Sequence, residues 1–292
     1  MRILSWQLFL EELVGEKPIS NYDQYIIDMN TTMSDKLFFL DEIKFDVIVD
    51  FGCADGTFLQ SISRMRPNVK IIGYDLDQTM LDKASSKLPK NAILTDNWNE
   101  VIKEISGYKH PLLNLSSVIH EVYSYSNSKT VSKFWNQQVF AGNFKHITIR
   151  DMMPSVELTR NEITNYKDDA RKVRQKADKR YLLSFEEVWG SINADYRNFI
   201  HFLLKYKYTD NWDREVNENY LPITLETLKS KIPSDYSITY EDDFVLPYLR
   251  QEVKRDFNVE LTHSTHVKMI IKNQFSRNFA DGCSDYLTQF FI

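Results

Sequence analysis

The feature that most constrains the fold is an apolar run that ends in an acidic, glycine-punctuated turn, at residues 47–56. The run begins with three β-branched residues, which predict a short buried strand. Gly52 and Gly56 then allow backbone torsions that other residues avoid. A helical pattern resumes after the turn, so the turn joins a strand to a helix. Turns of this kind hold nucleotide-like ligands against backbone amides.

The spacing of this turn argues against a dinucleotide ligand. That fingerprint needs glycine at its first, third and sixth places, where this chain has Gly52, Ala54 and Thr57. Asp50, just before the turn, would repel a pyrophosphate but suits a cationic ligand that carries an amino acid's ammonium group. A nicotinamide-dependent dehydrogenase is therefore only a remote alternative.

Residues 50–56, with the sequence DFGCADG, resemble motif I of class I S-adenosylmethionine (SAM)-dependent methyltransferases. The family pattern is acid, any, Gly, any, Gly, any, Gly. Ala54 replaces the middle glycine, and as a small residue it still permits close approach of a ligand. The resemblance covers roughly residues 40–152 and 236–273. It implies SAM as the cofactor, S-adenosylhomocysteine (SAH) as the product and methyl transfer as the activity.

Further acidic residues follow the second and third predicted strands, at the positions that the resemblance requires. Asp75 ends a second apolar run about 20 residues after the turn, where a ribose-binding carboxylate is expected. Residues 92–96 predict the third strand, and the residues after it meet the adenine in the family. The resemblance thus implies cofactor contacts at Asp50, Phe51, Gly52, Ala54, Gly56, Asp75, Leu76, Asp96, Asn97, Trp98 and Ser117.

The order of strand and helix signals predicts an α/β fold. Five alternations up to residue 151 imply a parallel, doubly wound sheet, with Asp77 as the N-cap of one of its helices. Two later strand candidates, at 236–240 and 266–271, match the sixth and the reversed seventh strand of the methyltransferase sheet. We therefore expect a seven-stranded, mostly parallel sheet of the class I methyltransferase type with a helical insertion.

The long interval before residue 236 predicts an inserted subdomain, because a doubly wound fold needs only one helix there. We expect an N-terminal helical segment or lid at 1–40, a SAM-binding core at 41–154 and 236–292, and an inserted helical subdomain at 155–235. Within the insert, Ser184 and Glu187 resemble a capping box, and an apolar stripe predicts one amphipathic helix up to Leu204.

Aromatic residues are dense after this predicted helix. Their side chains either line an acceptor pocket or fill the core of the small helical subdomain. The residues in question are Tyr206, Tyr208, Trp212 and Tyr220.

Composition sets wider bounds on the function. The chain has 292 residues, enough for a sizeable core, and a formal net charge of −5, which is not that of a basic nucleic-acid binder. Its two cysteines, Cys53 and Cys283, are too few for a disulfide framework or a zinc site. Residues 3–13 predict an amphipathic helix rather than a signal peptide, and no run approaches membrane-spanning length. We expect a cytoplasmic protein that does not contact a membrane.

The end of the fourth predicted strand carries the candidate catalytic residues. His120 is the first choice for a general base, because its unperturbed pKa lies near neutrality. Glu121 is expected to orient it or to act as the base itself. The competing interpretation is a structural histidine packed in the core. Tyr123 and Tyr125, and Arg150 and Asp151 at the end of the fifth strand, are candidate acceptor contacts.

A basic cluster in the insert supplies the remaining candidates. Lys172, Lys176 and Arg180 belong to it, and they either contact the phosphates of an RNA or nucleotide acceptor or form a solvated helix face. His263 and His266 have no clustered partner with ligand spacing, so no metal is expected.

Three hypotheses about the function follow from these candidates. The first is a SAM-dependent methyltransferase that transfers a methyl group to an O or N atom of RNA or a nucleotide, which we favour on sequence. The second is the same enzyme class acting on a small metabolite or a protein side chain. The third is an inactive SAM-binding partner subunit, which the complete set of cofactor acids disfavours.

Overall fold

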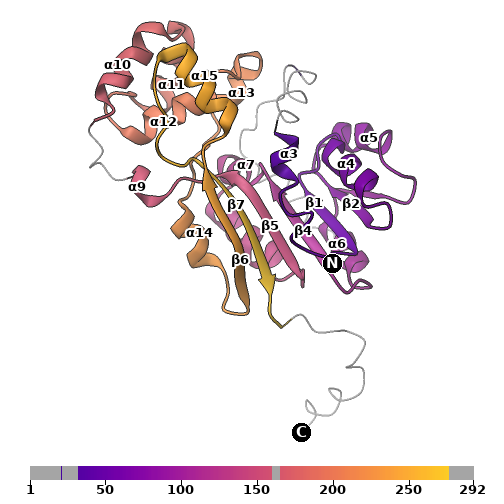
Figure 1. Ribbon diagram of the computed structural model, residues 1–292. Coiled ribbons are helices and arrows are strands. Elements are labelled where there is room, and N and C mark those ends of the chain that lie inside the picture. The colour runs from indigo at the N-terminus through magenta and orange to yellow at the C-terminus, as the bar shows by residue number, and fades with distance from the viewer. Residues whose placement is uncertain (1–20, 22–31, 160–164, 276–292) are drawn as a thin grey trace.

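The computed structural model describes residue 21 and residues 32–159 and 165–275. Its centre is a seven-stranded sheet with the strand order β3-β2-β1-β4-β5-β7-β6 (Figure 1). β7 runs antiparallel to β5 and β6, and the other neighbours pair in parallel. The predicted class I methyltransferase-like fold is therefore confirmed. The strands are β1 (Val47–Phe51), β2 (Lys70–Tyr74), β3 (Ile93–Thr95), β4 (Pro111–Ser116), β5 (His146–Met152), β6 (Tyr236–Phe244) and β7 (His266–Asn273).

Helices cover both faces of this sheet. Successive strand residues point to opposite faces, so Val47 and Val49 of β1 enter one hydrophobic cluster and Ile48 enters another. All five residues of β1 are buried, which explains its continuous apolar run. The first cluster includes side chains of α6 (Trp98–Ile105), α7 (Ile119–Tyr125), the π-helix Phe134–Val139 that continues α8 (Ser128–Lys133), and α14 (Leu225–Lys231). The second includes side chains of α4 (Thr57–Met65) and α5 (Gln78–Ser85).

Local signals fix where individual helices begin. Asp77 caps α5 as predicted, since its Oδ1 accepts the backbone N–H of Thr79 at 2.8 Å. A carboxylate in this position satisfies backbone donors that the first turn of a helix leaves open. The capping holds α5 directly after the end of β2, and so fixes the chain beside Asp75.

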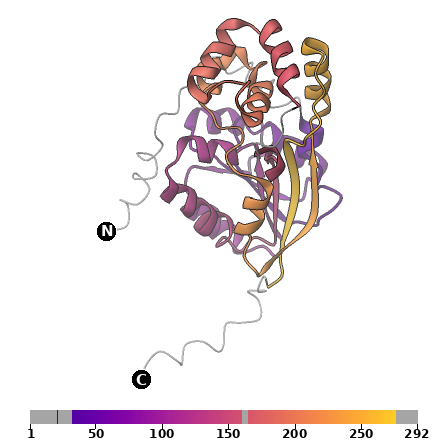
Figure 2. The ribbon, with the colours of Figure 1, turned by 90° about the vertical axis from the view of Figure 1, so that its left-hand side faces the viewer.

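A further group of helices forms a layer above the carboxyl ends of the strands (Figures 1 and 2). It has a hydrophobic cluster of its own. Its members are α9 (Val156–Thr159), α10 (Lys167–Lys176), α11 (Lys179–Trp189), α12 (Tyr196–Lys205), the 3-10 helix Thr209–Asn211, α13 (Trp212–Glu215) and α15 (Pro247–Phe257).

The layer draws on two segments of the chain. Leu249, Val253 and Phe257 of α15, which follows β6, belong to its cluster. Conversely, Leu225 and Leu228 of α14, within the predicted insert, pack against the sheet. The boundaries 155–235 of the inserted subdomain stay a proposal. We propose in addition that α14 belongs with the sheet and α15 with the helical layer.

The predicted single helix up to Leu204 is wrong in the structure. Two helices, α11 and α12, replace it, with Gly190 at a φ of 88° after α11 and Asp195 as the N-cap of α12. Ser184 lies inside α11, whose N-cap is Asp178, so the predicted capping box does not start a helix. Both helices bury apolar residues in the same cluster, which is why the apolar period appears continuous in the sequence.

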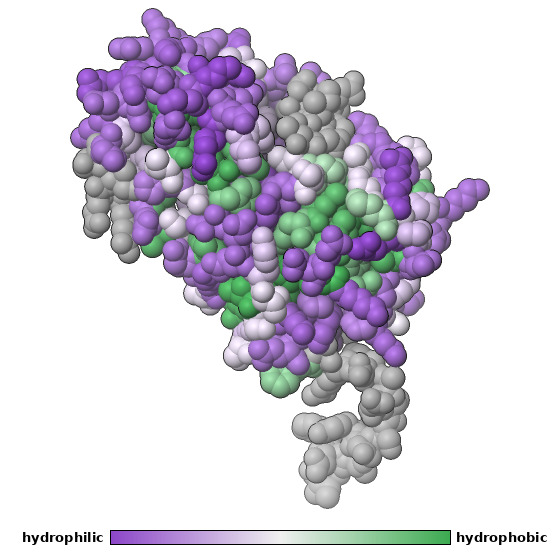
Figure 3. Space-filling view, in the orientation of Figure 1, coloured by the Kyte–Doolittle hydropathy of each residue, from purple (hydrophilic) through white to green (hydrophobic). Residues whose placement is uncertain are grey.

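The surface of the helical layer is mostly hydrophilic in the view of Figure 3, whereas apolar side chains gather near α3 (Met33–Lys36). Leu37 and Phe38 there pack, partly buried, against the second cluster of the sheet. Among the described residues, no helix has both the length and the apolar character needed to cross a bilayer. The predictions for residues 3–13, for the lid before residue 32 and for Cys283 fall outside the described ranges.

Candidate active site

The turn after β1 has the backbone that its glycines predict. Gly52 and Gly56 both adopt a φ of 74°, and Ala54 adopts a φ of 45°. A Cβ at Gly52 would lie 2.9 Å from Val118 Cγ2, so no larger residue fits there without a shift. Ala54, the one departure from the family pattern, thus takes a left-handed conformation that glycine adopts more easily.

Asp75 is fixed against this turn. Its Oδ2 accepts the backbone N–H of Ala54 at 2.8 Å, and its Oδ1 accepts that of Asp77 at 2.9 Å. Burial raises the pKa of Asp75, and the backbone N–H groups of Asp77, Ala54 and Leu76 oppose that shift. A carboxylate has about four lone-pair sites, so at least one acceptor site remains for a ligand hydroxyl. The structure therefore brings together the two elements that the sequence assigns to the cofactor.

Asp50 is buried at the end of β1. Asn114 Nδ2 of the neighbouring β4 donates a hydrogen bond to its Oδ1 at 2.7 Å. Burial raises the pKa of Asp50 to about 7, against the opposing effects of Asn114 and of the Lys36 charge. Burial disfavours the negative charge of the Asp50 carboxylate, and a cationic group bound beside it would stabilise that charge.

The residues after β3 have structural roles of their own. Asn97 caps α6 by accepting the backbone N–H of Asn99 at 3.1 Å. Trp98 is 3% exposed, and its ring packs 5.3 Å from that of Phe51 and 5.1 Å from that of Tyr74. Phe51 and Trp98 thus serve the core. The adenine contact remains a prediction, for which the exposed Asp96 is the most accessible of these residues.

A first recess of about 360 Å³ opens at the turn. Ser116 Oγ is buried without a hydrogen-bond partner among the described residues, and Ser116 lines this recess. A buried hydroxyl in this condition fits a polar ligand, because an unpaired group of this kind is costly. The residues of the recess that offer polar or charged groups, or close backbone approach, are Lys36, Asp50, Gly52, Asp55, Thr57 and Ser116.

The partner of His120 is Asp151. His120 Nδ1 and Asp151 Oδ1 are 2.8 Å apart, and Asp151 also accepts the backbone N–H groups of Ile119 and Met152, each at 2.7 Å. Asp151, predicted as an acceptor contact, is fully buried and holds the position expected of a residue that orients His120. The roles expected of Glu121, as the orienting residue or as the base itself, stay predictions.

The charges around His120 outweigh its burial. Burial alone would lower its pKa, but the charge and hydrogen bond of Asp151 and the charges of Glu218 and Glu121 raise it to about 9. In return, the His120 charge holds the pKa of Asp151 below its usual value, against the effect of burial. His120 is thus protonated near neutral pH in the ligand-free protein.

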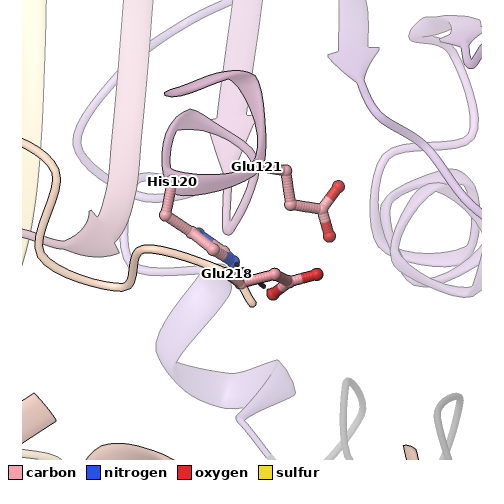
Figure 4. A group of neighbouring side chains, drawn as sticks. All are labelled: His120, Glu121 and Glu218. Carbon is pink, nitrogen blue, oxygen red and sulfur yellow. Dashed lines mark ion pairs between the residues drawn. The ribbon is translucent and has the colours of Figure 1, made fainter. Parts of the chain in front are cut away.

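Glu121 and Glu218 lie beside His120 (Figure 4). His120 and Glu121 come from α7, and Glu218 follows α13, with its Oε2 3.8 Å from His120 Nε2. Arg214 binds both carboxylates: its Nε is 2.7 Å from Glu218 Oε1 and its Nη2 is 3.0 Å from Glu121 Oε1. Sequence reasoning missed Arg214 and Glu218, which no motif marks.

The three donors of Figure 4 have the chemistry of a metal site, since their ligand atoms all lie within 4.8 Å of one another. However, Arg214 already gives both carboxylates a cation, and Tyr125 donates a hydrogen bond to Glu218 Oε1 at 2.8 Å. The absence of a bound metal, which we expected from the sequence, stays a prediction that this ion-pair network supports.

Chelation tests that prediction. Because Arg214 satisfies both carboxylates, treatment with EDTA followed by desalting is expected to leave the methyl-transfer rate unchanged. The rate is measured before and after treatment, with Mg²⁺, Mn²⁺ or Zn²⁺ added back in parallel. Loss of activity that one of these ions restores would contradict the predicted absence of a metal and make His120, Glu121 and Glu218 the first candidate ligands.

A second recess, of about 740 Å³, lies between the carboxyl ends of β4 and β5 and the helical layer. It shares Lys36 with the first recess, and Ser117, adjacent to Ser116 of the first recess, lines it. Arg150 also lines it, as the sequence analysis expected of an acceptor contact. The side chains opposite the strand ends include Tyr208, Glu215, Glu218, Tyr220 and Tyr248.

The other predicted acceptor residues lie away from this recess. Tyr123 accepts a hydrogen bond from Trp135 Nε1 at 3.1 Å, and Tyr125 is buried against Glu218. No residue of α10 or α11 lines the recess, so the structure does not bring Lys172, Lys176 or Arg180 to it.

The basic cluster is also largely compensated where it lies. Lys172 pairs with Asp169 at 2.6 Å, and Arg171 pairs with Asp168. The guanidinium of Arg180 lies 4.2 Å from the centroid of the Tyr181 ring. Such pairing is typical of a solvated helix face.

No family model matches the sequence, and no curated protein is similar to it in sequence. Among solved structures, the chain is similar to the plantazolicin methyltransferase BamL in complex with SAH (11% identity, 87% of this chain and 88% of that one, TM-score 0.45). It is also similar to the plantazolicin methyltransferase BpumL with SAH (14%, 91% and 96%, TM-score 0.43) and to the methyltransferase domain of bacterial CtHen1 (12%, 84% and 98%, TM-score 0.42). These likenesses are remote, and the fold assignment rests on the strand order of the sheet itself.

Proposed function

We propose that this chain is a SAM-dependent methyltransferase that acts on an O or N atom of a small molecule or of a peptide side chain. The observation that carries the proposal is that the two recesses are neighbours: Lys36 lines both, Ser116 lines the first and the adjacent Ser117 lines the second. A ligand held by Asp50 and Asp75 at the turn would meet, end to end, an acceptor in the second recess.

Methyl transfer from SAM needs few catalytic groups from the protein. Bound SAM supplies an already activated methyl group, so the chain has to position the acceptor, exclude water and remove a proton where the acceptor carries one. His120 is placed to take that proton, with Asp151 fixing its ring through Nδ1. Nε2 is the nitrogen left to face the acceptor, on the side of Glu218.

The lining of the second recess supports a small or peptide acceptor over RNA. Tyrosines such as Tyr208 and Tyr248 line this recess, and its two lining cations, Lys36 and Arg150, are both buried and form no exposed basic surface for a phosphate backbone. Binding of RNA depends largely on cations that neutralise phosphates. The cations of the insert lie outside this recess, so RNA becomes the alternative and the small acceptor the proposal.

The pH profile tests the role of His120 as a base. With a pKa of about 9, only roughly 1% of His120 is neutral at pH 7 in the free protein, and that fraction rises about tenfold per pH unit below the pKa. We therefore expect kcat/KM, which reports the free enzyme, to rise with pH and level off near pH 9. A profile that is flat from pH 7 to pH 9 would contradict proton removal by His120.

The acceptor class is tested with methyl-labelled SAM on host extract treated with nuclease or with protease. Label that survives both treatments, or that is lost only with protease, is the expected result. Label lost only with nuclease would make RNA the acceptor and overturn that part of the proposal. If no label is transferred although SAH binds, the chain is an inactive SAM-binding subunit.

A further inference from the structure

We propose that Lys36 and Arg150 form a binding site for a carboxylate where the two recesses meet. The inference deepens the proposed function and rests on it. The carboxylate belongs either to the methionine end of the cofactor or to the acceptor, and the same two cations would bind it in either case. In the sequence, Lys36 falls within the predicted N-terminal helical segment or lid, and nothing in its neighbourhood along the chain marks a ligand contact.

Both cations are buried and have donors to spare. Lys36 and Arg150 are each 5% exposed. Arg150 donates from Nε to Asp35 Oδ2 at 3.0 Å and from Nη1 to Ser117 Oγ at 3.2 Å, whereas its buried Nη2 has no partner in the described part of the chain. No hydrogen bond or ion pair within residues 32–159 and 165–275 engages the Lys36 ammonium group either.

The nearby carboxylates are already engaged. Asp35 is shared between Arg150 and Lys268, and its charge, like those of Asp50 and Asp151, only partly offsets the factors that lower the pKa of Lys36. Asp151 pairs with His120, and Asp50 accepts from Asn114. Burial, and then the Arg150 charge, lower the pKa of Lys36 to about 8, which shows that the two cations repel each other in this setting. At pH 7 Lys36 nevertheless stays mostly charged.

A bound carboxylate would neutralise part of the charge of these two buried cations and accept from their unused donors. Two buried cations with unused donors are costly, and one anion with two oxygens can accept from the Lys36 ammonium and from Arg150 Nη2 at once. The first recess also carries Asp50 beside Lys36, so it offers an acceptor for an ammonium group and a donor for a carboxylate. That pair is complementary to the zwitterionic end of an amino acid, which favours the cofactor as the source.

The test compares the affinities of SAH and of decarboxylated SAM, which has no carboxylate, by calorimetric titration. Lys36→Met is expected to weaken SAH binding about 10- to 100-fold, the usual effect of losing a hydrogen bond to a charged group, and to leave the affinity for decarboxylated SAM unchanged. Lys36→Arg should retain most of the affinity. Lys44→Met, at an exposed lysine near α3, is the matched control.

A second arm identifies the acceptor as the source. Sodium acetate is titrated into wild-type and Lys36→Met protein, with and without saturating SAH, and the melting temperature is followed. Stabilisation of the SAH-saturated wild type that the variant lacks would place an acceptor carboxylate at Lys36. If the variant changes neither SAH affinity nor the response to acetate, the inference is overturned. If wild-type protein binds no SAH, it is the proposed function that fails.

Discussion

Replacing His120 with glutamine is expected to lower kcat for methyl transfer by about 100- to 10,000-fold, the usual contribution of a general base. Glutamine fills a similar volume and can still donate a hydrogen bond to Asp151, so the buried carboxylate keeps a partner. It cannot take a proton near neutral pH. The measurement is single-turnover transfer of labelled methyl to the acceptor fraction, together with the affinity for SAH, which should stay unchanged.

The matched control for this variant is His110→Gln, at a histidine whose side chain is 42% exposed. It is expected to leave kcat and SAH affinity as they are. If His120→Gln keeps the wild-type kcat and only lowers the melting temperature, His120 is a structural histidine, the competing interpretation from the sequence.

Replacing Arg214 with methionine is expected to lower the free energy of unfolding by about 3–5 kcal/mol. Arg214 is bonded to Glu218, which is 2% exposed, and to Glu121, so its removal leaves a buried carboxylate without its main cation. Because the Arg214 charge is also the largest factor holding the pKa of Glu218 below its usual value against burial, the variant should favour a protonated Glu218. Urea unfolding followed by tryptophan fluorescence gives the free energy.

Two further variants make this result specific. Arg255→Met removes an exposed arginine that pairs with Asp256 and should leave the free energy of unfolding nearly unchanged. Adding Glu218→Gln to Arg214→Met should restore part of the lost stability, because it removes the unpaired charge. A loss below about 1 kcal/mol for Arg214→Met would mean that water, rather than Arg214, balances the two carboxylates.

The proposed cofactor half of the site could be inferred from the sequence because its parts are local in the chain. Asp50, Gly52 and Gly56 lie on one strand-to-helix turn, and Asp75 ends the next strand, which parallel pairing places alongside the first. Strand order followed from the alternation of strands and helices, together with the two late strands. The hydrogen bond from the Ala54 amide to Asp75 joins the turn after β1 to the end of β2.

The acceptor half was not predictable in the same way. Arg214 and Glu218 lie almost one hundred residues from His120 along the chain. The tertiary packing of the helical layer brings them together, and no periodic pattern in the sequence indicates that packing. Glu121, next to His120 in the sequence, pairs with Arg214, whereas Asp151 of β5 bonds to His120 Nδ1. Lys36 was missed for the same reason, since its role depends on Arg150.

The proposed SAM site at the turn after β1 can be tested by equilibrium binding of SAH and of NAD to the wild-type chain and to Asp75→Ala. We predict that the wild type binds SAH and not NAD, and that Asp75→Ala weakens SAH binding at least about tenfold, since a charged partner of the ribose is lost. Binding of NAD, or no binding of SAH by correctly folded wild-type protein, would rule out a SAM site at this turn.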